Sequence, residues 1–277
     1  MVPWIDDLGI AEEDSQGLRS AEWAPTDGDA VLDIVVLRLP HIANFDDFDP
    51  MARRPGVRLR YVDRAAMLGA PDLLIVPGTK MTRSDLSFLR ERGLDQAVCD
   101  HAQRGGAVLG ICGGYQMLGQ RIEDPDGIEG PKGDAPGLGL LQVVTRYAGE
   151  KATVQVQGRV ESPVGLLGQS WGQGFSAYEI HVGRTLALDS APLRVLSMDG
   201  TWRPEGAEGF SGMVVGTYLH GLLGNPMLLE GLLGGLAARR GLTLPSPAGR
   251  YDVYNRLASV LRRHLDLDRL RSVVGPV

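Results

Sequence analysis

Apolar residues in the first half of the chain gather into short continuous runs, with polar segments between them. Four of these runs predict buried strands: residues 32–39, 57–62, 73–76 and 107–111. Continuous runs are typical of parallel strands, because helices cover both faces of such a sheet and neither face alternates toward water. Between the third and fourth runs we predict a helix opened by a capping box of Thr82 and Asp85, then a second helix over residues 94–104. The order of strands and helices indicates an α/β domain built on a parallel sheet.

The pattern changes after Gly119, because residues 121–137 are polar and rich in glycine and proline. Five strand-like segments follow, and they suggest a more antiparallel half: residues 138–147, 153–160, 175–181, 193–198 and 213–219. We expect the first two to be neighbours joined by a short turn. Helical spacing returns over residues 226–240, with Asn225 as the cap, and over residues 252–271.

These elements divide the chain into three predicted parts. Residues 1–30 are acidic and turn-rich and are expected to be a connector or arm. Residues 31–223 are expected to form a three-layer α/β/α domain, and residues 224–277 a helical appendage that packs on it. Ligands of such sheets bind beyond the carboxyl ends of the parallel strands, so we expect the chemistry at that edge.

Composition narrows the possible functions. The 277 residues carry a net charge of −6, which argues against nucleic acid as the main partner. Two cysteines, Cys99 and Cys112, cannot build a disulfide framework, so a reducing, cytoplasmic setting is expected. The chain has no apolar run of about 18 residues and does not open with a basic and then an apolar segment, so we expect neither a membrane span nor a secretory signal. We assign no metal ligands.

Cys112 is the candidate nucleophile. It follows the fourth apolar run and stands between Gly110 and Gly114, which is the spacing of a nucleophile elbow with sulfur in place of a hydroxyl. Such a turn strains the nucleophile's backbone and brings its neighbours so close that a Cβ does not fit. The thiol then lies at a helix N-terminus, where the positive end of the dipole favours the thiolate. The alternative is a small buried core cysteine, a description that suits Cys99 better because it has no glycine neighbours.

A thiol nucleophile needs a base, and the base is usually histidine. His220 is the candidate, since it ends an apolar strand and precedes Gly221, which places it at the same sheet edge as Cys112. His101 and His264 fall within predicted helices and are expected to be surface or packing residues.

Attack on a carbonyl also needs donors for the oxyanion. The backbone N–H of Gly113, just after the nucleophile, supplies one of them. The loop after the third strand, at Gly78 and Thr79, is the candidate for the other. For Gly78 the alternative is a turn residue that only ends the strand.

Several stretches give the chain a specific resemblance. Residues 110–119 resemble the nucleophile motif of class I glutamine amidotransferases. Residues 216–221 resemble the histidine motif of the branch that contains cobyric acid synthases and cobyrinic acid diamide synthases. Residues 2–15 resemble the connector between the two domains of the cobyric acid synthase family. Three further stretches look like the same family: residues 38–50, 76–80 and 178–183.

The resemblance implies a flavodoxin-like class I amidotransferase fold and a glutamine-hydrolysing amide ligase component. In that family the thiolate, here Cys112, attacks the side-chain amide of glutamine, His220 protonates the leaving ammonia, and the residue at the place of Gln116 contacts the substrate. Most class I enzymes have Glu two residues after the histidine, but Leu222 stands there. A Cys–His dyad is therefore expected. Glu179 keeps two possible roles, the orienting group of His220 or a glutamine contact.

The family's other half is an ATP-binding synthetase domain with a phosphate-binding loop. No such loop occurs in this sequence, so we expect the chain to be the amidotransferase half with its connector, and we expect no cofactor on it. Ammonia would pass to the synthetase domain as its partner. There ATP and Mg²⁺ would activate carboxylates of a corrinoid, converting adenosylcobyrinic acid a,c-diamide to cobyric acid.

Two other functions stay open at this point. One is a glutaminase subunit of a related amidotransferase, either cobyrinic acid a,c-diamide synthase or a cell-wall lipid-precursor amidotransferase; residues 38–50 argue against it. The other is a non-catalytic amidotransferase-like module that only binds a partner. The presence of both Cys112 and His220 argues against that module.

Overall fold

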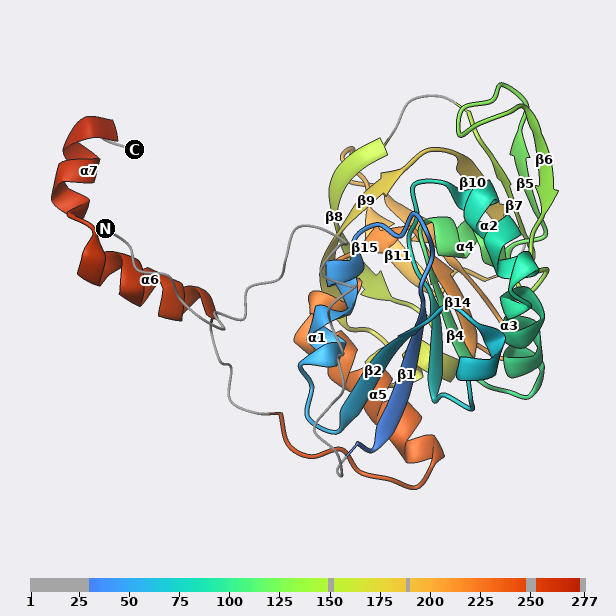
Figure 1. The fold of residues 1–277 in the computed structure, drawn as a ribbon, viewed down its shortest axis with the longest axis horizontal. Helices are drawn as coiled ribbons and strands as arrows, with labels where there is room; N and C mark the ends of the chain where they lie inside the picture. Colours follow the sequence, from blue (N-terminus) through green and yellow to red (C-terminus); the bar gives the residue numbers. More distant parts are fainter. Residues whose placement is uncertain (1–29, 149–151, 188–189, 248–252, 275–277) are drawn as a thin grey trace.

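The computed structural model describes residues 30–148, 152–187, 190–247 and 253–274, so the predicted arm lies outside the described residues except for its last position. The central element is a six-stranded sheet with the order β13-β14-β4-β3-β1-β2 (Figure 1). Its strands are β1 (Leu32–Leu37), β2 (Val57–Val62), β3 (Leu73–Val76), β4 (Ala107–Ile111), β13 (Ala207–Gly209) and β14 (Val214–Thr217). Every neighbouring pair is parallel except β13 with β14. The parallel sheet predicted from the apolar runs is confirmed.

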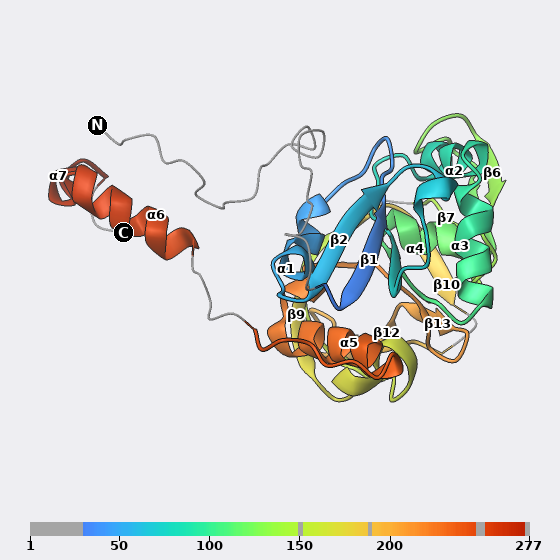
Figure 2. The same cartoon turned by 60° about the horizontal axis from the view of Figure 1, so that its bottom comes forward.

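Successive side chains along these strands enter two apolar layers, which explains why the strands are apolar at nearly every position. Val35 belongs to the layer on one face, and its neighbour Ile34 belongs to the layer on the other. Three helices cover the Val35 face: α2 (Thr82–Glu91), α3 (Leu94–Gln103) and α4 (Gly113–Leu118). Helix α5 (Pro226–Arg239) covers the Ile34 face, and Figure 2 shows it across the sheet from α2 and α3. The three-layer α/β/α arrangement is confirmed.

The second half of the chain forms two smaller sheets, with the orders β10-β7-β5-β6 and β12-β11-β8-β9-β15. Their strands are β5 (Arg121–Asp124), β6 (Gly133–Pro136), β7 (Val143–Arg146), β8 (Ala152–Val160), β9 (Gly174–His181), β10 (Arg184–Ala187), β11 (Leu193–Leu196), β12 (Trp202–Glu205) and β15 (Leu219–His220). Only β5 with β7 is a parallel pair, so this half is mostly antiparallel, as predicted.

The predicted pairing of the first two strands of this half is wrong. β7 pairs with β5 and β10, whereas β8 pairs with β9 and β11 in the other sheet. The partner of β7, β5, lies within the polar segment that showed no strand pattern. β5 and β6 are four residues each and half exposed. β7 therefore has a short polar strand, β5, as a neighbour, where the longer apolar strand β8 was expected.

The first helix of the predicted C-terminal appendage, α5, packs on the domain, because its leucines are buried in the apolar layer of the Ile34 face. The single helix predicted over residues 252–271 is two helices, α6 (Val253–His264) and α7 (Leu267–Val274). The side chain of Asp266 accepts a hydrogen bond from the N–H of Arg269 at 3.0 Å, which opens a new helix at that point. Figures 1 and 2 both show α6 and α7 clear of the sheet.

Five short helices complete the described part of the domain: η2 (Phe45–Phe48), α1 (Asp49–Ala52), η3 (Ala65–Met67), η4 (Gly165–Ser170) and η5 (Leu222–Gly224). The capping box predicted for α2 is wrong, because Met81 is the N-cap residue and its side chain makes no capping hydrogen bond. Asp85 is instead buried beneath the loop that precedes the helix. Within the described ranges, no helix combines the length and apolar character needed to cross a membrane.

Candidate active site

Cys112 stands in the sharp turn between β4 and α4, and its backbone is strained as the elbow spacing predicts. Its φ of 52° and ψ of −109° lie outside the regions that L-residues prefer. A Cβ added to Gly110 would lie 2.9 Å from the backbone nitrogen of Tyr115, and one on Gly114 would lie 1.9 Å from the carbonyl oxygen of Val76. Both glycines are therefore required by close approach of the backbone. The thiol is partly buried and donates to the carbonyl oxygen of Ile180 at 3.4 Å.

His220 lies beside Cys112 and is held by a carboxylate that the sequence analysis missed. Its Nδ1 lies 2.7 Å from Oδ2 of Asp47, while Oδ1 of Asp47 accepts the N–H of Gly221 at 2.7 Å. Tyr178 stacks on the imidazole, with ring centroids 5.4 Å apart. Because Nδ1 is occupied by Asp47, Nε2 is the nitrogen left to face the sulfur. The expected Cys–His pair thus becomes an aligned set of Cys112, His220 and Asp47.

The electrostatics of this set favour a protonated imidazole. Burial lowers the pKa of His220, but the hydrogen bonds to Asp47 and then to Cys112 outweigh it and raise the pKa to about 10. An imidazolium next to a thiol stabilises the thiolate, which is the nucleophilic form. Asp47 comes from η2, 173 residues before the histidine, and within residues 38–50 it looks no different from the neighbouring Asp46 and Asp49.

The predicted oxyanion residues are brought together beside the nucleophile. A Cβ added to Gly78 would lie 3.7 Å from Cβ of Cys112, and one on Gly113 would lie 3.2 Å from the backbone nitrogen of Thr79. The first hydrogen bond of α4 runs from the N–H of Gln116 to the carbonyl of Cys112 at 3.1 Å. The N–H groups of the first turn, including that of Gly113, precede this bond and are available to a ligand.

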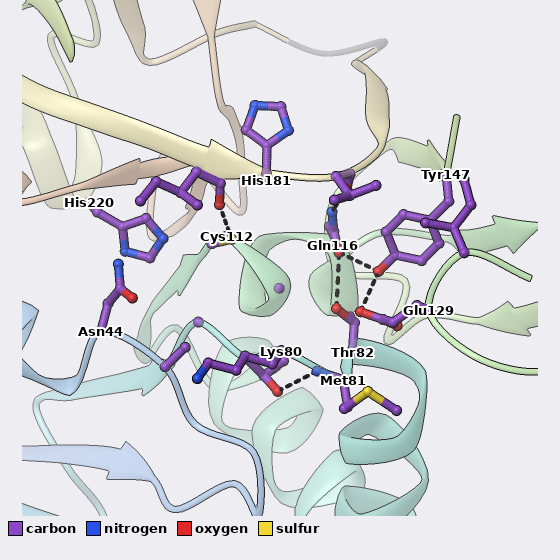
Figure 3. A pocket seen from close by; sticks show the side chains of 17 residues that line it. Asn44, Lys80, Met81, Thr82, Cys112, Gln116, Glu129, Tyr147, His181 and His220 are labelled. Atoms are coloured by element: carbon purple, nitrogen blue, oxygen red, sulfur yellow. Dashed lines mark hydrogen bonds between the residues drawn. The ribbon is translucent and has the colours of Figure 1, made fainter. Parts of the chain in front are cut away.

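A cavity of about 340 Å³ opens over Cys112, and His220 and the Gly78 loop form part of its wall (Figure 3). Five other polar side chains that the sequence did not single out also line it: Asn44, Lys80, Glu129, Tyr147 and His181. Glu129 accepts hydrogen bonds from the hydroxyl of Tyr147 and from the N–H of Arg83, both at 3.1 Å. A carboxylate on the wall suits a ligand that carries a positive charge. Among the described residues, no cluster of three or more His, Cys, Asp or Glu is arranged to hold a metal ion.

Gln116 lines the same cavity, but its amide is fully engaged by the protein. Its Oε1 accepts from the hydroxyls of Thr82 at 3.2 Å and Tyr147 at 2.8 Å. Its Nε2 donates to the carbonyl of Val182 at 3.2 Å and to the hydroxyl of Tyr218 at 3.1 Å. Each acceptor site and donor hydrogen of the amide therefore has a neighbour in the protein, and the single hydroxyl proton of Tyr147 is shared between Gln116 and Glu129. In this structure Gln116 shapes the wall of the cavity, and its predicted direct contact with glutamine stays a prediction.

Glu179 does not orient His220, and it lies outside the cavity over Cys112. It pairs with Arg203 at 2.5 Å and lies 3.9 Å from Nε2 of His181, and it lines a second cavity of about 400 Å³. Burial raises the pKa of Glu179, but the neighbouring His181 and the hydrogen bond from Arg203 outweigh this and lower it. On β9 the residue opposite His220 is Tyr178, so the neighbouring Glu179 points to the other face of the strand. Asp47 holds the place suggested for Glu179.

The remaining candidates of the sequence analysis stand apart from the reactive centre. His101 is buried with its Nε2 3.1 Å from the carbonyl oxygen of Ala107, a packing role as predicted. His264 lies on α6 with its Nδ1 2.9 Å from the carbonyl of Val260. Cys99 is partly buried on α3 and packs against the apolar layer of the Val35 face.

Comparison with known proteins gives consistent results. Residues 33–227 match the family described as CobB/CobQ-like glutamine amidotransferase domain. Cobyric acid synthase of Sorangium cellulosum is 41% identical over 293 residues, covering 99% of this chain and 56% of that protein. Cobyric acid synthase of Paracoccus denitrificans is 44% identical over 273 residues, covering 98% of this chain and 53% of that protein. The chain thus spans about half the length of the curated relatives it matches.

Solved structures resemble the chain in fold. PurLQS from Thermotoga maritima superposes with a TM-score of 0.58 at 20% identity, over 74% of this chain and 99% of that one. A crystal structure described as a glutamine amidotransferase superposes with a TM-score of 0.52 at 21% identity, over 74% of this chain and 98% of that one. The flavodoxin-like, class I type of architecture expected from the sequence agrees with these likenesses.

Proposed function

Because the chain belongs to the CobB/CobQ-like glutamine amidotransferase family, we propose that it hydrolyses glutamine at Cys112 and supplies the ammonia for amidation of a corrinoid. The observation that carries this proposal is the alignment of Cys112, His220 and Asp47 over a cavity large enough for an amino acid. A thiol, a base and an orienting carboxylate in that order are the parts that nucleophilic acyl transfer needs.

The first half of the reaction cleaves the amide. The sulfur of Cys112 attacks the side-chain carbonyl carbon of glutamine, and the oxygen takes up negative charge. The N–H of Gly113 and that of Gly78 or Thr79 stabilise this oxyanion. The C–N bond then breaks, and Nε2 of His220 gives its proton to the leaving nitrogen, so that ammonia and a glutamyl thioester remain.

The second half regenerates the enzyme. Nε2 of His220, now neutral, takes a proton from water as the water attacks the thioester. The C–S bond breaks, glutamate leaves, and the thiolate and imidazolium are restored. Asp47 contributes by holding Nδ1, which keeps Nε2 directed at the sulfur through both halves of the reaction.

The cavity suggests how glutamine is recognised. The carboxylate of Glu129 is the acidic group on the wall that can bind the α-ammonium of the substrate. Its position is set by hydrogen bonds from the hydroxyl of Tyr147 and the N–H of Arg83. Gln116 would act through Tyr147, since it shares that hydroxyl, rather than through a free amide.

The acceptor and partner follow from the relatives named cobyric acid synthase. We propose that ammonia passes to an ATP-binding synthetase half, which amidates adenosylcobyrinic acid a,c-diamide to cobyric acid. ATP and Mg²⁺ would bind to that half, because this sequence contains no phosphate-binding loop. The use of a free thiol as the nucleophile suits the reducing cytoplasm.

A glutaminase assay with a labelling control tests the proposal. Cys112→Ala should abolish release of glutamate, whereas Cys99→Ala should keep it, because Cys99 lies away from the cavity. A chloroketone analogue of glutamine should alkylate Cys112 and spare Cys99, as read by peptide mass mapping. Full activity of Cys112→Ala, or labelling of Cys99 alone, would contradict the proposal.

A further inference from the structure

A second buried carboxylate, Asp85, lies beneath the loop that carries Gly78 and Thr79. It belongs to the first turn of α2 and is fully buried. Its Oδ2 accepts from the hydroxyl of Thr79 at 2.5 Å and from the N–H of His41 at 3.2 Å. Its Oδ1 lies 2.7 Å from Nδ1 of His41. One side chain therefore holds two loops together, residues 38–44 and 77–81.

The two loops are also joined by their backbones. The N–H of Ala43 donates to the carbonyl of Gly78 at 2.9 Å, and the N–H of Lys80 donates to the carbonyl of His41 at 3.1 Å. The hydroxyl of Thr79 accepts the N–H of Met81 at 3.1 Å, so it links the carboxylate to the start of α2. A ladder of two backbone bonds is weak alone, and the charge-assisted hydrogen bonds from Thr79 and His41 to a buried carboxylate reinforce it.

Both loops lead directly to the reactive centre. The first runs into η2, which carries the Asp47 that holds His220. The second presents the backbone of Gly78 and Thr79 to Gly113 beside the nucleophile. Whatever fixes the two loops to each other therefore fixes the oxyanion donors relative to the base.

We propose that Asp85 is a positioning residue of the glutaminase reaction, clamping the oxyanion loop through Thr79 against the loop that leads to Asp47 through His41. The inference rests on the proposed function, since the clamp matters for rate only if an oxyanion forms beside Gly78 and Thr79. A hydrogen-bond donor displaced by about 1 Å mainly weakens the stabilisation of the transition state and has little effect on binding of the substrate. Loosening the clamp should therefore lower kcat and leave KM nearly unchanged.

Asp85→Asn tests the clamp without changing the volume of the side chain. We expect kcat for glutamine to fall about 10- to 100-fold, part of the loss known for a missing oxyanion donor, with KM within about threefold. The matched control is Asp33→Asn, which also removes a carboxylate bound by several donors, but at the amino end of β1. Its kcat should stay within about twofold of wild type. Equal losses in the two variants, or a rise in KM with kcat kept, would overturn the proposal.

Thr79→Val adds a second route to the same question. It removes the hydroxyl while His41 still satisfies Asp85, so it keeps the test open if Asp85→Asn fails to fold. Its kcat should fall in the same direction. The kcat of the double variant should be no lower than that of the more severe single variant, because both changes break the same hydrogen-bonded contact. Losses that multiply would mean that Thr79 and Asp85 act independently and would overturn the clamp.

Hydrogen exchange separates this inference from the proposed function. The amides of Ala43, Lys80 and Met81 join the two loops or the start of α2, and we expect them to exchange about tenfold faster in Asp85→Asn and unchanged in Asp33→Asn. Unchanged exchange in Asp85→Asn would refute the clamp whatever the activity. The other outcome is that exchange is faster in Asp85→Asn, but the wild-type protein neither cleaves glutamine nor reacts with the chloroketone. That result would refute the proposed function and would leave the structural link between the two loops intact.

Discussion

The two edges of the central sheet use carboxylates in different ways. At the amino edge, Asp33 at the start of β1 accepts two hydrogen bonds from Arg60, each of 2.9 Å, and one from Arg58 of 3.0 Å. Burial raises the pKa of Asp33, but these guanidinium hydrogen bonds outweigh it and lower the pKa. The pair stays permanently charged, so it can join β1 to β2 but cannot exchange a proton at neutral pH.

At the carboxyl edge, Asp47 pairs with a histidine instead. The side chains of Asp47 and His220 are 4% and 3% exposed, so the pair is much better shielded from water than Asp33 with its arginines. An imidazole held at Nδ1 still has Nε2 for proton exchange. The cation paired with each carboxylate therefore decides whether the pair can exchange a proton: the arginines at the amino edge cannot at neutral pH, and the histidine at the carboxyl edge can.

The elbow is the most crowded part of the carboxyl edge, and Gly114→Ala should break it. The new Cβ would lie 1.9 Å from the carbonyl oxygen of Val76, so β3 and α4 must separate. We expect a loss of at least about 4 kcal/mol in the free energy of unfolding, or no folded protein at all, measured by urea unfolding. Gly224→Ala is the control, because its Cβ meets no atom within 4 Å. Similar stability of the two variants would show that the end of β3 is free to move.

The next largest effect should come from the carboxylate behind His220. Asp47→Asn keeps the shape but no longer favours an imidazolium, so kcat for glutamine should fall about 10²- to 10⁴-fold with little change in KM. Steady-state glutaminase kinetics measure this. Asp46→Asn, at an exposed position next to it, is the matched control and should keep its activity. A loss under tenfold in Asp47→Asn would reduce the reactive set to Cys112 and His220.

The same pair should make stability depend on pH. The pKa of His220 is raised from 6.5 to about 10, so the stability from its protonated form is fully present below pH 6.5 and is lost as the pH rises through 10. We expect the free energy of unfolding to fall on the order of 2–4 kcal/mol over that window. Urea unfolding at several pH values checks this, with His220→Gln as the reference. If the two chains lose stability in parallel, His220 is not protonated in the folded protein.

The smallest effect belongs to the amino edge. Asp33→Asn should cost only about 1 kcal/mol at neutral pH, because its arginines are partly exposed and water screens the pair. The pKa of Asp33 is lowered from 3.8, so the wild type's advantage exists above that pH and should vanish as the pH falls through the folded-state value. Urea unfolding at pH 7 and at about pH 3 measures both. A loss as large as that expected for Gly114→Ala would show that water does not screen this pair.

The reactive centre was only partly predictable because its parts differ in how far apart they lie in the sequence. Cys112 and its glycines act within one turn, and local sterics leave few other uses for that spacing. His220 was found because it ends a strand at the same edge. Asp47 was not, since what distinguishes it from Asp46 is a contact with a residue 173 positions away. The saturated amide of Gln116 was equally hidden, because its partners come from four other segments.

The parallel sheet, the elbow and the edge at which the chemistry lies could all be predicted from the sequence, because apolar runs and close-packed glycines act over a few residues. That β7 and β8 belong to different sheets, and that Asp47 rather than Glu179 holds His220, became visible only in the folded protein. Those outcomes depend on which segments, far apart in the sequence, pack against each other in the folded protein. Short polar strands such as β5 pair with their neighbours through packing and hydrogen bonds that the local sequence pattern does not predict.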